Sequence, residues 1–465
     1  MHRSFAKPNA MIGFWTGYGS HGLAVQNAIW TAAIHNVLHP NIFWMYSFLN
    51  PDMTYSASAR DMGRAFSSLR FEGVGKLLME STRQQDGIAL YHSMPSVHAA
   101  SILGYHQRSS DDDDGVPDTA RMSYPANRDG WVKTIKDLGL QFDFVSSEDV
   151  AKSPISNDKY KVLILPLAFA LSDKEIQHIE DFVSRGGVVV ADSSPGLFDE
   201  HCATRTDDAI KKLFDLSAAG ATRKIGKGWT IYLNKTWDQY PKQRAAGFGG
   251  ADYRELASSI LTKAGVRPSI EVLTPDNRQV SQAQIARYKF GSAEIVTIVK
   301  ENVAIAGVVG KDGVTTYNDA SLGPVARQEL TIKLPRKMYV ADIRSGKQFG
   351  FTDTVHTSIL IGDALILGLT SEQHAIKMEG ATTAKPGEHV SFTLSSTTPG
   401  TTLVRCHVFE PDGPLSPAYS RNVLIKNGNG TFTLPFALND PPGKYVIRST
   451  DVVTGATFEK TIELR

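Results

Sequence analysis

The chain has 465 residues, which is enough for roughly three or four domains of ordinary size. Its 49 Lys and Arg residues balance 48 Asp and Glu residues, and the net charge of +1 predicts neither nucleic acid nor an anionic membrane as a partner. No run of residues has the length and apolar character of a transmembrane helix, the first residues lack the pattern of a signal peptide, and the localisation is left open.

The first 85 residues read as two consecutive βα units. Residues 9–19 and 41–49 are predicted strands, residues 23–38 form a helix, and residues 54–81 form a long helix interrupted near Gly73. Two such units cannot close a sheet or cover both of its faces. By themselves they therefore form an incomplete α/β unit.

A doubly wound α/β pattern follows. Residues 87–91 form a strand, residues 127–138 a helix and residues 141–145 another strand. Between the first strand and the helix, residues 107–118 contain four consecutive aspartates. Like charges favour a solvated loop, whereas a calcium site would need ligands spaced around a defined turn.

The clearest local signals lie in residues 158–201. Residues 160–166 are too short an apolar run for a helix and predict a buried parallel strand. Ser172 and Glu175 have the spacing of a helix capping box, and Gly186 and Gly187 end that helix. Residues 188–191 form the next buried strand, and the order of elements predicts a flavodoxin-like sheet.

From about residue 266 the sequence becomes β-rich. An antiparallel β-domain is predicted to end near Leu369, and residues 374–465 alternate apolar and polar residues between turns rich in Pro and Gly. This last segment fits an immunoglobulin-like sandwich, although it lacks the Cys–Trp–Cys pattern of antibody domains. The strands expected in the first β-domain are 269–273, 285–289, 294–299, 328–334 and 338–343.

The middle of the chain resembles the trimerisation domain of glycoside hydrolase family 42 β-galactosidases. The similar segments are GIALYHSMPSVHAA at 87–100, NRDGWVKTIKDLGLQFDFV at 127–145, YKVLILPLAFALSD at 160–173 and IEDFVSRGGVVVADSSPGLFDEH at 179–201. The resemblance implies an amidotransferase-like, flavodoxin-like fold for this domain.

The flanking segments agree with the resemblance. Residues 9–81 look like the last two βα units of the family's catalytic (β/α)8 (TIM) barrel, and residues 338–369 look like its small β-domain. The fold expected is therefore multidomain, α/β followed by all-β. Its domains are a barrel end at 1–85, an amidotransferase-like trimerisation domain at 86–265, an antiparallel β-domain at 266–372 and an Ig-like sandwich at 373–465.

The resemblance implies the C-terminal part of a β-galactosidase-like glycoside hydrolase of carbohydrate metabolism. Its partners would be a β-galactoside or related glycan and further copies of the chain, as a trimer. Such enzymes need two carboxylates, at the ends of the fourth and seventh barrel strands. The seventh strand would be Met11–Tyr18, and the first 51 residues contain no Asp or Glu.

The catalytic residues therefore remain unknown, and we expect the isolated chain to be inactive, with the other barrel strands encoded upstream. The alternative is a non-catalytic oligomerisation or carbohydrate-binding protein.

Five residues are candidates for contact with a sugar. Trp15, Tyr18, Trp44 and Tyr46 cluster near the carboxyl ends of the two barrel strands, where barrel enzymes bind substrate. Their rings could form the wall of a sugar subsite or pack inside the protein. Asp52, the first acidic residue, could contact a sugar hydroxyl or belong to a loop or helix start.

No cofactor or metal ion is expected. His35 and His39 have the spacing of one helix face, with His21 nearby, but Pro40 ends that helix and no acidic partner lies close in sequence. The two cysteines, Cys202 and Cys406, fall in different predicted domains, which argues against both a disulfide and a cysteine metal site.

A working amidotransferase needs a Cys nucleophile on a sharp turn after a buried strand, with a His and an acid. Here the strand 188–191 leads into Asp192-Ser193-Ser194-Pro195-Gly196, which contains no Cys and no Gly-x-Ser-x-Gly elbow. Ser193 and Ser194 have no recognisable base, and Cys202 lies too far beyond the turn. We expect this domain to be structural.

Overall fold

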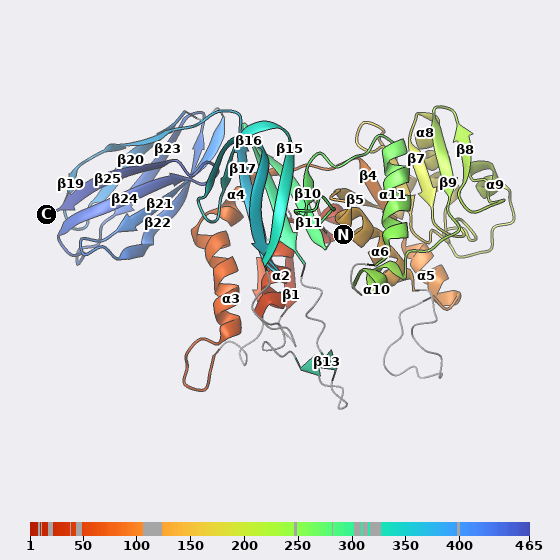
Figure 1. Ribbon diagram of the computed structural model, residues 1–465, viewed down its shortest axis with the longest axis horizontal. Helices are drawn as coiled ribbons and strands as arrows, with labels where there is room; N and C mark the ends of the chain where they lie inside the picture. Colours follow the sequence, from red (N-terminus) through yellow and green to blue (C-terminus); the bar gives the residue numbers. More distant parts are fainter. Residues whose placement is uncertain are drawn as a thin grey trace. The chain divides into compact units, whose positions relative to one another are not determined.

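The computed structural model describes residues 1–465 except 8, 9, 11, 17–21, 38, 43–48, 106–122, 246–248, 281, 302–307, 310–314, 317–326 and 398–399. The chain forms two compact units (Figure 1). Unit 1 contains Met1–Ala10, Gln85–Ser269 and Gln279–Ala283. Unit 2 contains Met11–Gln84, Ile270–Arg278 and Gln284–Arg465.

Unit 1 is built around one mostly parallel sheet with the strand order β5-β4-β6-β7-β9-β8. All neighbouring strands are parallel except β8, which runs antiparallel to β9. The central strands are short apolar runs, as strands buried on both faces require. The strands are β4 (Ile88–His92), β5 (Phe142–Ser146), β6 (Val162–Leu165), β7 (Val188–Ala191), β8 (Ala221–Ile225) and β9 (Gly228–Tyr232).

Helices cover both faces of this sheet, because alternate residues of each strand join different cores. Ile88 and Leu90 of β4 pack with Trp131, whereas Ala89 and Tyr91 belong to the opposite core. The helices are α1 (His2–Phe5), α5 (Met94–Ile102), α6 (Tyr124–Asp137), α7 (Ser147–Lys152), α8 (Asp173–Ser184), α9 (Ala209–Leu213), α10 (Tyr240–Ala245) and α11 (Ala251–Lys263).

Local signals and structure agree closely in α8. The Ser172 hydroxyl accepts a hydrogen bond from the Glu175 backbone N–H, and the Glu175 side chain accepts one from the Ser172 N–H. This is the capping box that the sequence predicts. By contrast, α5 and α7 were not among the expected elements.

The N-terminal part of unit 2 contains a parallel pair of strands, β1 (Gly13–Thr16) and β2 (His39–Ile42), with α2 (Gly22–Ala33) between them. The predicted long helix is divided into α3 (Ala57–Phe66), a π-helical turn η1 (Ser67–Phe71) and α4 (Val74–Glu80). Gly73 has a φ of 88° before α4, a left-handed conformation that glycine adopts without strain.

A seven-stranded sheet forms the centre of unit 2, in the order β10-β15-β17-β12-β11-β3 with β16 beside β15. Residues 328–334 and 338–343, expected as separate strands, lie largely in one strand, β15, with a register shift between Lys333 and Met338. The strands are β3 (Thr82–Arg83), β10 (Glu271–Leu273), β11 (Ala283–Phe290), β12 (Ala293–Lys300), β15 (Arg327–Asp342), β16 (Gln348–Leu360) and β17 (Ala364–Thr370). A two-stranded ladder, β13 (Val308–Val309) with β14 (Thr315–Thr316), lies outside this sheet.

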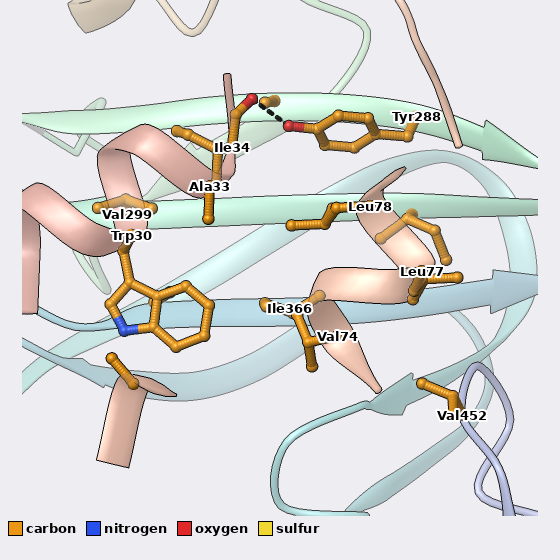
Figure 2. Packing of buried hydrophobic residues seen from close by; sticks show 14 of the residues in the cluster. Trp30, Ala33, Ile34, Val74, Leu77, Leu78, Tyr288, Val299, Ile366 and Val452 are labelled. Carbon is orange, nitrogen blue, oxygen red and sulfur yellow. Dashed lines mark hydrogen bonds between the residues drawn. The ribbon is translucent and has the colours of Figure 1, made fainter. Parts of the chain in front are cut away.

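One core joins the N-terminal helices to this sheet (Figure 2). Trp30 of α2 and Leu77 of α4 are fully buried with Ile366 of β17. Tyr288 of β11 donates a hydrogen bond to the carbonyl oxygen of Ile34, just after α2. Helices and strands that are far apart in sequence therefore share one apolar interior.

The C-terminal strands of unit 2 form an eight-stranded sheet in the order β18-β20-β23-β22-β21-β24-β25-β19. Strands β22 and β23 pair where Lys426 faces Asn429, and alternate side chains such as Phe392, Val404 and Tyr445 enclose the core. The strands are β18 (Ile376–Gly380), β19 (Thr383–Ala384), β20 (His389–Ser396), β21 (Thr401–Phe409), β22 (Leu415–Lys426), β23 (Asn429–Pro435), β24 (Gly443–Asp451) and β25 (Thr457–Leu464).

Cys202 and Cys406 lie in different units, and both are free thiols. None of the helices that the structure describes is long and apolar enough to cross a membrane.

Candidate functional site

The structure describes only part of the predicted sugar site. Trp15 lies in β1, where its backbone pairs in register with Asn41 of β2. Tyr18, Trp44 and Tyr46 lie outside the described residues. A sugar subsite formed by these four aromatic residues therefore remains a prediction.

Asp52 lies in an exposed turn. Its carboxylate accepts hydrogen bonds from the Thr54 hydroxyl at 2.6 Å and the Thr54 backbone N–H at 3.0 Å, and these bonds lower the pKa of Asp52. The Asn50 side chain also donates to the Thr54 hydroxyl at 2.9 Å. These contacts are those of a turn residue, and contact of Asp52 with a sugar stays a prediction.

Among the described residues, no three His, Cys, Asp or Glu side chains converge as a metal site. His21 lies outside the described residues, and His35 faces the side-chain oxygen of Gln284 at 3.3 Å.

The main polar cluster of unit 1 lies at the carboxyl edge of its parallel sheet, the usual position of ligand sites in such sheets. Asp192 follows β7 and is fully buried. Its carboxylate accepts four hydrogen bonds, from Asn127 Nδ2 at 2.6 Å, Trp131 Nε1 at 3.0 Å, Leu167 N at 2.8 Å and Ser193 N at 2.7 Å. Burial raises the pKa of Asp192 to about 6, although the four donors act in the opposite direction.

The turn after Asp192 contains the two serines considered as nucleophiles. Ser194 has a φ of 43°, and its hydroxyl lies 3.3 Å from the hydroxyl of Ser193. In the part of the chain that is described, no histidine or carboxylate side chain forms a hydrogen bond with either serine hydroxyl. The carboxylate of Asp192 is directed at backbone and helix donors, so it positions the turn.

The same cluster holds the segment after β9 against α6. Asn127 Oδ1 accepts a hydrogen bond from the Trp237 backbone N–H at 2.6 Å, and the Trp131 and Trp237 rings stack with centroids 3.8 Å apart. A Cβ at Gly130 would lie 2.0 Å from the Trp237 carbonyl oxygen, so the close approach requires glycine there. We call Asn127, Trp131, Asp192 and Trp237 the Asp192 cluster.

Two further buried polar groups stabilise unit 1. Tyr91 of β4 donates to Glu175 of α8, and burial raises the pKa of both residues. Asp137 of α6 pairs with Arg244 and accepts a hydrogen bond from Tyr240 at 2.6 Å, with all three side chains buried. Both groups are internally satisfied and connect elements of the scaffold.

A cavity of 510 Å³ lies beside β5 in unit 1. Three of its polar side chains contact one another, because Lys159 Nζ lies 3.0 Å from an Asp143 carboxylate oxygen, and the Tyr160 hydroxyl lies 3.3 Å from the same oxygen. Asp149, which also lines the cavity, accepts a hydrogen bond from the Ser146 hydroxyl at 2.8 Å. We find no arrangement of reacting groups in it.

Apolar side chains are exposed on α5 and on the loop after β7. Met94, Ile102, Leu103 and Leu197 are all exposed, and Ile102 retains 70% of its accessible surface. The two segments meet, because Phe198 and Cys202 pack on the small core that contains Ala99 and Ala100 of α5. We call these four exposed residues the α5 surface. Sequence reasoning missed it because α5 was not predicted, although Ser93 before Pro95 is a helix-start signal.

Part of the chain is similar to known proteins. Residues 98–221 match the model of the β-galactosidase trimerisation domain. Two structures of Gan42B, a GH42 β-galactosidase from G. stearothermophilus, one of them a catalytic mutant, are each 12% identical to the chain, with a TM-score of 0.50. The matched region covers 75% of this chain and 51% of the Gan42B chain in each case. A β-galactosidase from Bacillus circulans sp. alkalophilus is also 12% identical, with a TM-score of 0.49, covering 77% of this chain and 55% of its own.

A search among curated proteins finds no match. The chain spans about half the length of the Gan42B structures. Residues 98–221 are therefore similar to the β-galactosidase trimerisation domain, and about three quarters of the chain has a mixed α/β fold similar to that of the GH42 β-galactosidase Gan42B.

Proposed function

We propose that this chain is the C-terminal, assembly-forming part of a β-galactosidase-like glycoside hydrolase, and that unit 1 joins copies of the chain into a homo-oligomer. The observation that carries the proposal is the match of residues 98–221 to a trimerisation domain. The Asp192 cluster supports a structural role for this domain, since every hydrogen bond of its carboxylate is used within the fold.

The domain labels are part of this proposal. The strand order of the unit 1 sheet fits the flavodoxin-like, amidotransferase-like fold, in which the second strand in sequence lies at one edge. The pair β1 and β2 with α2 fits the end of a (β/α)8 barrel. The core enclosed by the C-terminal strands fits an Ig-like sandwich. The boundaries proposed are 1–85, 86–265, 266–372 and 373–465.

We assign the α5 surface as the contact with a second copy of the chain. Three of its four residues, Ile102, Leu103 and Leu197, fall within the segment that matches the trimerisation domain. Several exposed apolar side chains gathered on neighbouring segments often mark a protein interface. The apolar cluster below them gives a rigid base, because Ala99 and Phe169 are buried in it.

Light scattering coupled to size-exclusion chromatography tests this assignment. The unmodified chain should elute as an oligomer, and Ile102→Asp should shift it toward monomer because a charge at an apolar contact must be desolvated. Leu438→Asp is the matched control, since Leu438 in unit 2 is 83% exposed and lies outside the α5 surface. A monomeric unmodified chain would refute the assembly role. An Ile102→Asp variant that stays oligomeric would refute the α5 surface.

Hydrolysis of nitrophenyl β-galactoside tests the catalytic part of the proposal. We expect no turnover above background from the 465-residue chain, because retaining chemistry needs two carboxylates and the first 51 residues contain none. Turnover that disappears in Asp52→Asn would show instead that the chain is itself a catalyst.

A further inference from the structure

A groove of 370 Å³ lies within unit 2, where the seven-stranded sheet meets the turn between β24 and β25. Its size falls in the range of about 300–1,000 Å³ that is typical of small-molecule sites. The sheet contributes Tyr339, Gln348 and Thr370, the turn contributes Thr454, and β25 contributes its first residue, Thr457.

The partly exposed ring of Tyr339 lines the groove, and the ring of Phe351 packs against it. Tyr339 of β15 faces Phe351 of β16 on one side and Thr370 of β17 on the other, so the three side chains share one face of the sheet. The two rings lie with centroids 5.0 Å apart. Phe351 retains 54% of its accessible surface, so one ring is available to a ligand.

The turn that forms the other wall is held rigidly. Asp451, fully buried, accepts hydrogen bonds from the backbone N–H groups of Val453 at 2.9 Å and Thr454 at 3.0 Å. The turn also contacts the sheet, since Gln348 Nε2 donates to the Thr454 carbonyl at 2.9 Å. The groove is therefore formed before any ligand arrives.

Close backbone contact brings the turn onto the sheet. A Cβ at Gly368 of β17 would lie 2.2 Å from the Val453 carbonyl oxygen, so only glycine permits this approach. The floor of the groove therefore depends on a residue that has no side chain.

Several polar groups at the groove have no intramolecular partner among the described residues. The Tyr339 hydroxyl, the Gln373 amide and the His374 ring line the groove, and none of the three forms a side-chain hydrogen bond within the part of the chain that the structure describes. Amide and imidazole groups can both donate and accept hydrogen bonds, as the hydroxyls of a ligand require. Among the described residues that line the groove, none is Asp, Glu, Lys or Arg.

This combination selects a class of ligand. A groove without charged walls does not favour phosphate, a metal cation or an acidic peptide. A neutral saccharide combines apolar C–H faces, which stack on aromatic rings, with hydroxyls that both donate and accept hydrogen bonds. We propose that this groove binds one or two residues of a neutral saccharide, with Phe351 and Tyr339 under the ring and Gln373 and His374 at its hydroxyls. The proposal does not depend on assembly through unit 1.

Saturation-transfer NMR on the full chain tests the proposal, with lactose, cellobiose and maltose as separate probes. At least one probe should show transfer, and Phe351→Ala should weaken its binding about tenfold or more, equivalent to about 1.4 kcal/mol. Phe351 is exposed, so this variant should fold, which a thermal melt checks. Tyr339→Phe keeps the ring and removes only the hydroxyl, so it should retain stacking and lose less affinity.

Trp229→Ala is the matched control. Trp229 is an exposed aromatic residue of β9 in unit 1, so its replacement by alanine should leave saccharide binding unchanged. Three results would overturn the proposal. The first is that none of the three probes shows saturation transfer. The second is that Phe351→Ala binds as tightly as the unmodified chain. The third is that Trp15→Ala loses binding while Phe351→Ala retains it. The last would place the saccharide at the predicted barrel-end site.

Discussion

Asn127 joins two distant parts of unit 1 through one side chain, because its Nδ2 donates to Asp192 at 2.6 Å while its Oδ1 accepts from the Trp237 backbone. Asp192 needs to be an acceptor on both oxygens, since its four partners are all donors. An asparagine at position 192 cannot meet this need, because its NH2 group would face a donor.

We therefore predict that Asp192→Asn destabilises unit 1 by about 2–3 kcal/mol, the cost of hydrogen bonds lost to a buried charged group. Urea unfolding, monitored by tryptophan fluorescence, measures this change in the free energy of unfolding, because Trp131 and Trp237 lie in the cluster. Asp215→Asn is the control, since Asp215 is partly exposed and its carboxylate accepts hydrogen bonds from one nearby residue, Ser217. Equal stability of both variants would contradict the role given to the Asp192 cluster.

The Asp137–Arg244 pair should show the asymmetry of buried ion pairs. Both side chains are buried, at 0% and 1% exposure, so Arg244→Met leaves a buried carboxylate without its cation. We expect a loss of about 3–5 kcal/mol in the free energy of unfolding. The double variant Asp137→Leu with Arg244→Met should recover part of that loss. If the double variant is no more stable than the single one, the loss is due to packing and not to an uncompensated charge.

In unit 2, the hydrogen bond from Tyr288 to the Ile34 carbonyl should make a measurable contribution to the free energy of unfolding. Tyr288→Phe removes the hydroxyl from a fully buried site and leaves that carbonyl oxygen without its donor. The expected cost is about 1–2 kcal/mol. Chemical denaturation measures the free energy of unfolding of this variant and of the control Tyr55→Phe, a change at an exposed tyrosine. A cost within error of zero would mean that water replaces the hydroxyl.

His92 should contribute to acid sensitivity of unit 1. Burial is the largest cause that lowers its pKa below 6.5, the nearby Arg128 and the N-terminal amine act in the same direction, and Glu148 acts against them. Because the folded-state pKa is lowered, the neutral ring is favoured in the fold. Its contribution to stability is complete above pH 6.5 and is lost as the pH falls through the folded-state pKa.

His92→Phe should flatten the fall in thermal stability between neutral and acidic pH, because phenylalanine cannot take up a proton. The new ring should fit, since the His92 ring packs beside Phe5 with centroids 5.9 Å apart. His201→Gln, at an exposed histidine, should leave the fall unchanged. If His92→Phe is as acid-sensitive as the unmodified chain, other groups cause the fall.

The sequence by itself determined the elements whose signals are local. The strand in 160–166, the capping box at Ser172 and Glu175 and the strand at 188–191 all appear in the structure, because apolar run length and end-capping act within a few residues. The change to β-rich sequence near residue 266 was visible for the same reason. The similarity to the trimerisation domain also rests on the order of these local segments.

Contacts between distant residues decided the rest. Strand β3 at Thr82–Arg83 is too short to be recognised in sequence, and it is a strand only because it pairs with β11. The two expected strands around Pro335 lie in one strand because neighbouring strands pair with both halves across a register shift.

The same holds for the sites. Asp192 looked like a turn residue, and its four donors come from the adjoining residue and from segments 25 to 65 residues away in sequence. Tyr339, Gln373 and Thr454 border one groove only after the sheet and the C-terminal strands have packed together. The spacing of apolar residues and the capping signals in the sequence indicate which helix or strand a residue belongs to. Which residues meet depends on tertiary packing, whose contacts leave no regular spacing in the sequence.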